Sequence, residues 1–488
     1  MKLGALLDKA GIAAATKANA EVTGFAIDHR KVAPGTVFGA FQGAAANGED
    51  FIPAAIAAGA VAIVARPEAS VEGALHIADD QPRRAFAQVA AQFYRPVPET
   101  VVAVTGTNGK TSTAEMTRQI WRMCGQRAAS IGTLGVTTPD GSVSTGLTTP
   151  DIVTFLANMT GLAREGVTHV AYEASSHGLS QFRNEGLAVA AGAFTNFSRD
   201  HLDYHGTMDE YFAAKMRLVA EVIDAGGTLV AWADDARSAE VMDRARARGL
   251  TVFSVGTQGE DIRLVSREAT QLGQELVVVH AGEERRLRLP LIGEYQVANA
   301  LVSAGLALAT GSDAGAVFDA VGRLQPVRGR LERAAITHAG APVYVDYAHT
   351  PDALEAAIAA LRPHVSERLI VVFGAGGDRD TGKRGPMGEV AAAHADLVIV
   401  TDDNPRGEDP AAIRAQVMQG APEAREIGGR RDAIAAALAE AAATDIVLIA
   451  GKGHEQGQII GSGENMKVLP FDDVEVARAC AVPQGDRA

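Results

Sequence analysis

Cysteine is scarce in this sequence, since only Cys124 and Cys480 occur among its 488 residues. Two cysteines are too few for a disulfide framework, so we expect a protein of the reducing cytoplasm. Positive charge is also in deficit, and the formal net charge is −14. This deficit argues against a broad basic surface for nucleic acid or anionic lipid. Anionic substrates must therefore be bound by local loops and single cations.

Long apolar runs are missing as well. No stretch of about 18 apolar residues, the length that spans a bilayer, occurs in the chain. The N-terminal segment carries Asp8 and Lys9 where the apolar core of a signal peptide would lie. We therefore expect a soluble protein without membrane insertion and without a nucleic-acid partner.

The residues that are present indicate an α/β protein of several domains. The hydrophobic fraction is 47%, and 488 residues are too many for a single core. We expect a small N-terminal α/β domain over 1–92, a central parallel-sheet domain over 93–328 and a C-terminal Rossmann-like domain over 329–488. Pro96 and Pro98 mark the first boundary.

The strongest motif reads VVAVTGTNGKTST. An apolar strand, a glycine turn and a helix in this order form a phosphate cradle. Gly106 and Gly109 let the backbone approach an anion, and the helix start supplies N–H donors. Lys110 adds a positive charge, and the Thr111 hydroxyl is placed to bind Mg²⁺. Because Val104 replaces the first glycine of a standard P-loop, the motif is a shortened variant. A turn that merely closes a βα unit is the less favoured interpretation.

Polar residues follow further strands of the central block. Glu173 and His201 each follow an apolar stretch, and loops at the carboxyl ends of parallel strands should face the phosphate site. Glu173 suits a hard cation, whereas His201 fits a ligand and a structural histidine equally well. By default Lys215 is a solvated helix lysine. Thr148 and Thr149 would by default cap a helix.

Four strands of the third block also end in polar loops, which carry Arg379, Asn404, Arg406 and Glu455. Opposite charges suit a zwitterion, because arginine holds a carboxylate in a bidentate fork and glutamate holds an ammonium. Four unrelated solvated loops explain the pattern equally well. The nearby GAGG stretch only weakly suggests a nicotinamide or flavin site, since its spacing is not G-x-G-x-x-G.

Taken together, these motifs resemble the ATP-dependent Mur ligases of peptidoglycan synthesis over nearly the whole chain. The stretches that carry the resemblance are TGTNGKTST, EASSHGL, NFSRDHLDYHG, VRGRLE, DYAHTPDAL, GDRD, DNPR and GKGHE. DNPR is similar to the motif of members that add meso-2,6-diaminopimelate to UDP-N-acetylmuramoyl-L-alanyl-D-glutamate. Its Arg406 would read the distal carboxylate that lysine lacks. The resemblance implies an ADP-forming ligase that uses ATP and Mg²⁺, makes an acyl phosphate and works as a cytoplasmic monomer.

The resemblance also implies roles for individual residues. Catalytic roles would fall to Lys110, Glu173, His201 and Lys215, and Mg²⁺ ligands would be Thr111, Glu173, His201 and Lys215 as its carbamate, an anionic oxygen ligand. ATP would be bound by Gly106, Thr107, Asn108, Gly109, Lys110, Thr111, Ser112, Asn299, Arg330 and Asp346. The UDP-linked substrate would contact Ile27, His29, Ala44, Ala45, Ala46, Thr148, Thr149, Ser175, Gln181 and Arg183. Diaminopimelate would contact Arg379, Asp403, Asn404, Pro405, Arg406, Gly451 and Glu455.

Some positions depart from the family pattern. His29 stands where the family usually has serine, and residues 44–46 offer no side-chain hydrogen-bond groups, so uridine contacts there must be largely main chain. Without the resemblance, the segment 28–30 reads as an ordinary turn. Gln296 stands where relatives often have asparagine, which affects only the adenine side.

Two other functions compete with this one. A folylpolyglutamate synthetase-like ligase would share the phosphate loop and the chemistry. A nucleotide switch is disfavoured, because guanine switches need an N-K-x-D motif and no Asn-Lys pair occurs in the sequence.

Overall fold

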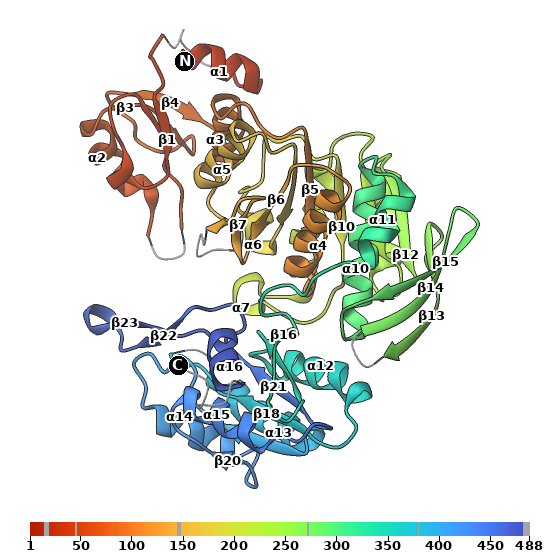
Figure 1. The fold of residues 1–488 in the computed structure, drawn as a ribbon. Coiled ribbons are helices and arrows are strands. Elements are labelled where there is room, and N and C mark those ends of the chain that lie inside the picture. The colour runs from red at the N-terminus through yellow and green to blue at the C-terminus, as the bar shows by residue number, and fades with distance from the viewer. Residues whose placement is uncertain (14–18, 44–45, 144–147, 271–272, 379, 482–488) are drawn as a thin grey trace. The chain divides into compact units, whose positions relative to one another are not determined.

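The computed structural model describes residues 1–13, 19–43, 46–143, 148–270, 273–378 and 380–481, and it confirms the α/β class (Figure 1). The described chain forms two compact units. The first contains Met1–Leu264, Val279–Glu283 and Asn299–Ala320; the second contains Val265–Val278, Glu284–Ala298 and the described residues from Val321 onward. Among the described residues, no helix has both the length and the apolar character needed to cross a membrane.

The N-terminal segment of the first unit forms a parallel four-stranded sheet in the order β1-β2-β3-β4. Gly59, with φ +102°, lies between α2 and β3. The elements are α1 (Leu3–Ala10), β1 (Gly24–Ala26), β2 (Thr36–Gly39), α2 (Ile52–Ala57), β3 (Ala60–Ala65), β4 (Leu75–Ala78) and α3 (Pro82–Phe93).

The central sheet is parallel over seven neighbouring strands, in the order β13-β12-β11-β10-β5-β9-β6. Strands β7 and β8 extend it antiparallel beyond β6. Beyond β13, the order continues through β14 and β15. The strands are β5 (Thr100–Thr105), β6 (Ala128–Gly132), β7 (Gly135–Thr137), β8 (Ser142–Val143), β9 (His169–Glu173), β10 (Ala191–Phe194), β11 (Thr228–Trp232), β12 (Thr251–Gly256), β13 (Ile262–Thr270), β14 (Gly273–His280) and β15 (Glu283–Leu289).

One hydrophobic core joins the N-terminal segment to the central sheet, because Phe86 of α3 and Phe155 of α5 belong to the same buried cluster. The helices of this region are α4 (Lys110–Met123), α5 (Ile152–Arg164), α6 (Ser176–Ser180), α7 (Leu202–His205), α8 (Met208–Arg217), α9 (Ser238–Ala247), α10 (Glu294–Ala309) and α11 (Ala314–Val321). Helix α4 confirms the helix that the sequence predicts directly after the glycine turn.

The register of the central strands brings three strand ends together. Val104 of β5 pairs with Glu173 of β9, and Thr105 pairs with Phe194 of β10. Because the three strands are parallel, the segments that follow them leave the sheet at the same edge. This edge is where the sequence predicts phosphate binding.

The second unit contains a sheet in the order β16-β17-β21-β18-β19-β20, parallel except for β16. Along β18, Leu369, Val371 and Phe373 pack with α12 and α13, whereas Ile370 and Val372 pack with α15 and α16. Because successive side chains point to opposite faces, helices cover both faces of this sheet.

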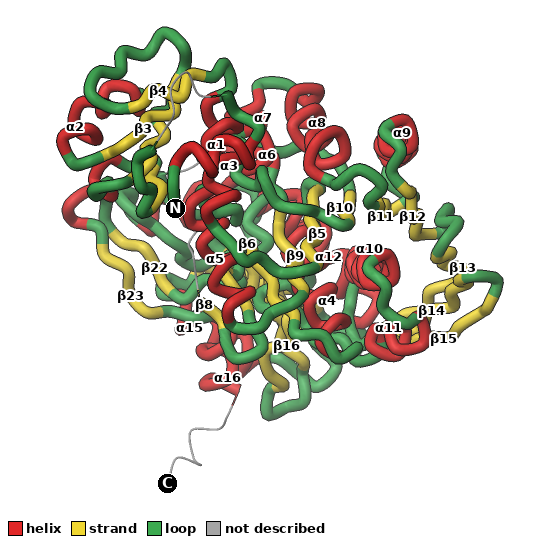
Figure 2. Tube along the Cα trace, turned by 90° about the horizontal axis from the view of Figure 1, so that it is seen from above, coloured by secondary structure: helices red, strands yellow, loops and turns green. Residues whose placement is uncertain are grey.

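The second unit also contains a separate two-stranded antiparallel ribbon. The strands of this ribbon, β22 and β23, lie side by side in both views (Figures 1 and 2). The strands of the unit are β16 (Glu332–Ile336), β17 (Pro342–Asp346), β18 (Leu369–Phe373), β19 (Leu397–Val400), β20 (Arg425–Glu426), β21 (Ile446–Ala450), β22 (Gly457–Ile460) and β23 (Lys467–Pro470). Its helices are α12 (Pro351–Leu361), α13 (Arg384–His394), α14 (Pro410–Met418), α15 (Arg430–Glu440) and α16 (Asp473–Ala481).

Candidate active site

The loop between β5 and α4 forms an anion cradle. Gly106 and Gly109 have φ of +148° and +83°, a region that side chains rarely adopt. A Cβ at Gly106 would collide with the Thr195 hydroxyl, and a Cβ at Gly109 would collide with the Asn299 amide. Gly109 is the N-cap of α4 and, as a glycine, brings no capping side chain to this helix start. The first turn of α4 therefore lies where the sequence predicts an anion site.

The chain that follows β10 holds the phosphate loop in place. Asn196 accepts hydrogen bonds from the Thr107 N–H at 2.9 Å through its backbone oxygen and from the Asn108 N–H at 2.8 Å through Oδ1. The Thr195 hydroxyl donates to the Asn108 carbonyl oxygen at 2.6 Å. Sequence reasoning missed Thr195 and Asn196, although their signal was visible as two polar residues directly after an apolar strand.

Lys215 lies beneath this loop with 1% of its surface exposed, so the default of a solvated lysine is wrong. Its Nζ donates to the Gly106 carbonyl oxygen at 2.6 Å, and Lys110 Nζ donates to the same oxygen at 2.9 Å. Burial, together with the positive charge of Lys110, holds the pKa of Lys215 well below its ordinary value, while Asp200 opposes the shift. The surroundings of Lys215 therefore disfavour its charged form.

Glu173 is also buried, at 2% exposure. Its Oε1 accepts from the Thr133 N–H at 2.6 Å, and its Oε2 accepts from the Thr133 hydroxyl at 3.2 Å. His201 is exposed instead, and its Nε2 lies 3.3 Å from Asp200 Oδ2. Within the described chain, no group of three or more His, Cys, Asp or Glu residues could hold a metal ion.

The predicted contacts to the peptide part of the UDP-linked substrate form one network. The Thr149 hydroxyl donates to the Glu173 carbonyl oxygen and lies 2.9 Å from the Ser175 hydroxyl. Arg183 Nη1 donates to the Thr149 carbonyl oxygen at 2.8 Å, and its Nη2 donates to Gln181 Oε1 at 2.7 Å. The structure therefore brings four of these residues together beside Glu173.

The expectation that Thr148 or Thr149 caps the following helix by default is wrong. The N-cap of α5 is Asp151, whose Oδ1 accepts from the N–H groups of residues 153 and 154. The Thr148 hydroxyl instead receives a hydrogen bond of 3.1 Å from the Thr133 hydroxyl. Asp151 binds the backbone more effectively because a carboxylate at the N-cap also meets the positive end of the helix dipole.

The predicted uridine loop is a single turn of 3-10 helix over His29–Lys31. Asp28 accepts three hydrogen bonds from the Arg30 guanidinium and one from the Arg30 N–H, and these bonds lower the pKa of Asp28 to about 2. The His29 ring stacks on Phe51 with centroids 4.3 Å apart. Of the other predicted contacts, Ile27 is partly buried and Ala46 exposed, whereas Ala44 and Ala45 lie outside the described residues.

In the second unit, Asp346 ends β17 as a buried carboxylate. Its oxygens accept from the Leu331 N–H at 2.7 Å and the Ala348 N–H at 2.8 Å. Burial raises the pKa of Asp346, while the Arg330 charge and both hydrogen bonds oppose the rise. The Arg330 guanidinium carbon lies 4.9 Å from the centroid of the Tyr347 ring.

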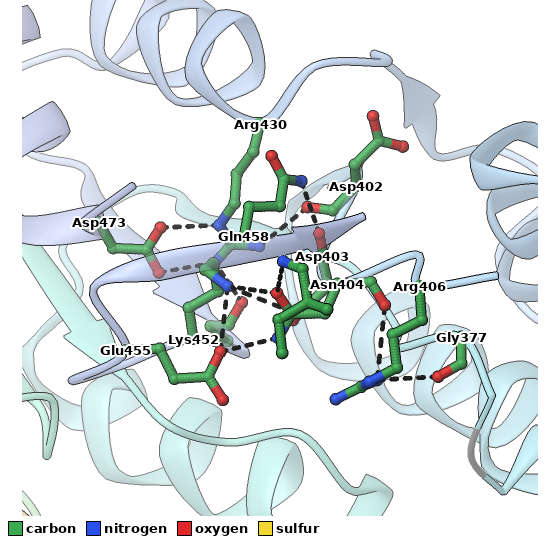
Figure 3. A network of polar contacts seen from close by, with 12 residues as sticks. Gly377, Asp402, Asp403, Asn404, Arg406, Arg430, Lys452, Glu455, Gln458 and Asp473 are labelled. Atoms are coloured by element: carbon green, nitrogen blue, oxygen red, sulfur yellow. Dashed lines mark hydrogen bonds and ion pairs between the residues drawn. The ribbon is translucent and has the colours of Figure 1, made fainter. Parts of the chain in front are cut away.

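The loops of the predicted zwitterion site meet at Asn404 (Figure 3). Its Nδ2 donates to Glu455 Oε2 at 2.8 Å, so the loops that carry these two residues are in direct contact. Arg406 Nη1 donates to the Gly377 carbonyl oxygen at 2.8 Å. Pro405 is buried, a Cβ at Gly451 would lie 2.6 Å from Asp403 Oδ2, and Arg379 lies outside the described residues.

Sequence reasoning missed the residue at the centre of this network. Lys452 has no exposed surface, and its Nζ donates to Asn404 Oδ1 at 2.9 Å and to Glu455 Oε2 at 3.0 Å. The signal that could have identified it is a lysine between two glycines directly after the apolar strand VLIA. The ribbon strand β22 supports the same group, because the Ile459 N–H donates to Asn404 Oδ1 at 2.9 Å.

Comparison with known proteins finds matches over nearly the whole chain. Three family models match, described as the Mur ligase family, catalytic domain, over 21–99, the Mur ligase middle domain over 104–307 and the Mur ligase, glutamate ligase domain, over 329–453. A curated UDP-N-acetylmuramoyl-L-alanyl-D-glutamate–2,6-diaminopimelate ligase from Zymomonas mobilis is 61% identical over 477 residues, 98% of each chain.

Two solved structures extend the comparison. A structure of a UDP-N-acetylmuramoyl-L-alanyl-D-glutamate–2,6-diaminopimelate ligase is similar over 99% of both chains, with 33% identity and a TM-score of 0.74. A folylpolyglutamate synthase from Mycobacterium tuberculosis, complexed with ADP and AMPPCP, covers 76% of this chain and 92% of its own, with 20% identity and a TM-score of 0.61. The second likeness is one of fold alone.

Proposed function

The chain belongs to the Mur ligase family, and from this premise we propose that it joins meso-2,6-diaminopimelate to UDP-N-acetylmuramoyl-L-alanyl-D-glutamate at the expense of ATP. The observation that carries the choice of amino acid is the contact of 2.8 Å between Asn404 and Glu455 in a network that also includes Arg406. Glu455 would hold an ammonium, and Arg406 would hold the distal carboxylate.

The reaction has two steps. A D-glutamyl carboxylate oxygen attacks the γ-phosphorus of ATP. The bond from this phosphorus to ADP breaks, so ADP departs and an acyl phosphate is formed. The amine of diaminopimelate then attacks the acyl carbon, phosphate departs and the nitrogen loses a proton. Lys110 and the first turn of α4 would hold the phosphate groups and offset their negative charge, first on the transferred phosphoryl group and later on the departing phosphate.

Mg²⁺ is part of this proposal, and the surroundings of Lys215 support it. Lys215 is buried against the phosphate loop with a lowered pKa, and a neutral amine can take up CO₂ to become an anionic carbamate. The carbamate would join Thr111, Glu173 and His201 as oxygen and nitrogen ligands. Bound Mg²⁺ would neutralise phosphate charge during the transfer.

The remaining assignments are proposed on the family pattern. The chain divides into an N-terminal domain over 1–92 for the uridine part, a central domain over 93–328 for ATP, and a C-terminal domain over 329–488 for the amino acid. The network of Thr149, Ser175, Gln181 and Arg183 would hold the muramoyl-dipeptide. The protein would work as a cytoplasmic monomer.

The test measures ADP release by the purified protein with UDP-N-acetylmuramoyl-L-alanyl-D-glutamate, ATP and Mg²⁺. Release should depend on meso-diaminopimelate, with L-lysine and the reaction without amine inactive, and Lys110→Ala should abolish it. ADP release with lysine but not with diaminopimelate would still support ligase activity, but it would overturn the role of Arg406. Release with a folate and glutamate instead would favour the folylpolyglutamate alternative, and ADP formation without any ligated product would revive the nucleotide switch.

A further inference from the structure

We propose that Lys452 is a positioning residue for the amino-acid substrate, which orients Asn404 and Glu455 to receive it. This role rests on the function proposed above. A side chain without exposed surface does not meet the substrate directly, so Lys452 acts through its two neighbours. Its Nζ lies 2.9 Å from Asn404 Oδ1 and 3.0 Å from Glu455 Oε2 (Figure 3).

The first effect of Lys452 is to fix the direction of the Asn404 amide. An ammonium only donates hydrogen bonds, so the amide oxygen faces Nζ and the amide nitrogen faces Glu455. The Ile459 N–H donates to the same oxygen at 2.9 Å and supports the same orientation. A reversed amide would set its NH₂ group against two donors and its oxygen against a carboxylate. Each contact would then be repulsive.

The second effect is to select one oxygen of Glu455. The bonds from Lys452 and Asn404 both fall on Oε2. In Figure 3 the other carboxylate oxygen points away from these two donors. This arrangement leaves Oε1 directed toward an incoming ammonium group, while Oε2 anchors the side chain to the protein.

The third effect is charge balance. Lys452 Nζ also lies 3.9 Å from Asp403 Oδ1, so one buried cation stands among two carboxylates. Arg430 lies within electrostatic reach of the same carboxylates, but its Nε and Nη2 each bond to Asp473 at 2.7 Å. Of these two buried cations, Lys452 is therefore the one that is hydrogen-bonded to Asn404 and Glu455. Without it, the carboxylates of Asp403 and Glu455 would lose the cation that lies 3.9 Å from the first and 3.0 Å from the second.

The experiment measures KM for each of the three substrates and kcat in the full-length chain. Lys452→Met keeps the length of the side chain but removes its charge and donors. We expect its KM for diaminopimelate to rise about tenfold or more, because Glu455 loses a charge-assisted hydrogen bond. KM for ATP and for the UDP-linked substrate should stay within about twofold of the wild-type values. Lys452→Arg, which keeps the cation, should recover part of the loss.

A matched control is Arg430→Lys, which alters a neighbouring buried cation whose partner is Asp473. It should lower the thermal midpoint of unfolding and leave KM for diaminopimelate unchanged. An unchanged diaminopimelate KM in folded Lys452→Met, or equal rises in all three KM values, would overturn the proposal. If Lys452→Met does not fold, Lys452→Gln, which also removes the charge, is measured in its place, and an unchanged diaminopimelate KM in that variant overturns the proposal equally. Absence of diaminopimelate-dependent turnover in the wild-type chain would refute the proposed function instead.

Discussion

Lys215 Nζ donates a hydrogen bond of 2.6 Å to the carbonyl oxygen of Gly106, across 109 positions of the sequence. The contact places a buried amine under the phosphate loop, where a second lysine, Lys110, binds the same oxygen. Two ammonium groups on one carbonyl oxygen repel each other, and burial penalises the charge further. Lys215 is thus the described lysine best suited to react as a free amine.

We predict that Lys215 carries a carbamate when CO₂ is present. Protein equilibrated with ¹³C-labelled bicarbonate should show a carbamate carbon signal by NMR that disappears in Lys215→Met. The signal should persist in Lys467→Met, because Lys467 is exposed on β23 and makes no contact with the phosphate loop among the described interactions. Ligase activity of Lys215→Met should fall about 100-fold or more through loss of a metal ligand. A labelled wild-type protein without the signal would contradict this prediction.

The phosphate loop should not tolerate a methyl group at Gly109. Gly109→Ala adds strain at φ +83° and drives a Cβ into the Asn299 amide. Gly125 supplies a matched control, because its φ is +94° but nothing lies within 4 Å of an added Cβ. Both variants should lose about 1 kcal/mol of stability to backbone strain. Only Gly109→Ala should weaken ATP binding by more than tenfold in calorimetry, an order of magnitude typical for a lost charge-assisted contact. Equal ATP affinity in both variants would argue against the cradle.

Arg406 should determine the choice between diaminopimelate and lysine. Replacement by methionine removes the guanidinium fork, and the KM for diaminopimelate should rise by about 10- to 100-fold. Turnover with L-lysine should not decrease, because lysine has no distal carboxylate. Arg425→Met, at an exposed arginine paired with Glu440, serves as the charge-matched control and should leave both values unchanged. A proportional loss for the two amino acids would show that Arg406 supports the loop rather than reading the substrate.

His454 should make stability depend on pH. Burial and the charges of Arg330 and Arg328 lower its pKa to about 4 from 6.5, and its Nδ1 has no hydrogen-bond partner among the described residues. The unfolded chain therefore takes up a proton below pH 6.5 that the folded chain refuses until about pH 4. Neutral His454 therefore makes its full contribution to the free energy of unfolding above pH 6.5. This contribution is lost as the pH falls toward 4, by at most about 3 kcal/mol.

The measurement for His454 is urea unfolding at pH 7 and pH 5. The wild-type protein should lose more stability between these values than His454→Phe, which cannot titrate but can still pack against Tyr347, whose ring centroid lies 4.9 Å away in the wild type. Parallel losses in the two proteins would mean that His454 is protonated in the folded state.

The sequence pattern predicted individual strands and helices, because these depend mainly on residues that are neighbours in the sequence. The apolar run before Gly106 became β5, and the helix predicted after the phosphate loop became α4. The cap of α5 was predicted wrongly, since Thr149 and Asp151 both have capping side chains and both lie near the helix start. The choice fell to Asp151 because the Thr149 hydroxyl is engaged by Glu173 and Ser175.

The sequence by itself determined the chemistry, because the phosphate loop and the DNPR and GKGHE stretches carry their residue types at fixed spacing. Only the tertiary structure decided which charged groups are buried and what they contact. Lys215 and Lys452 look like ordinary surface lysines in sequence, yet their surroundings come from segments 109 and 48 positions away. Burial and charge balance arise from contacts between distant segments, and these contacts exist only once the sheets have assembled.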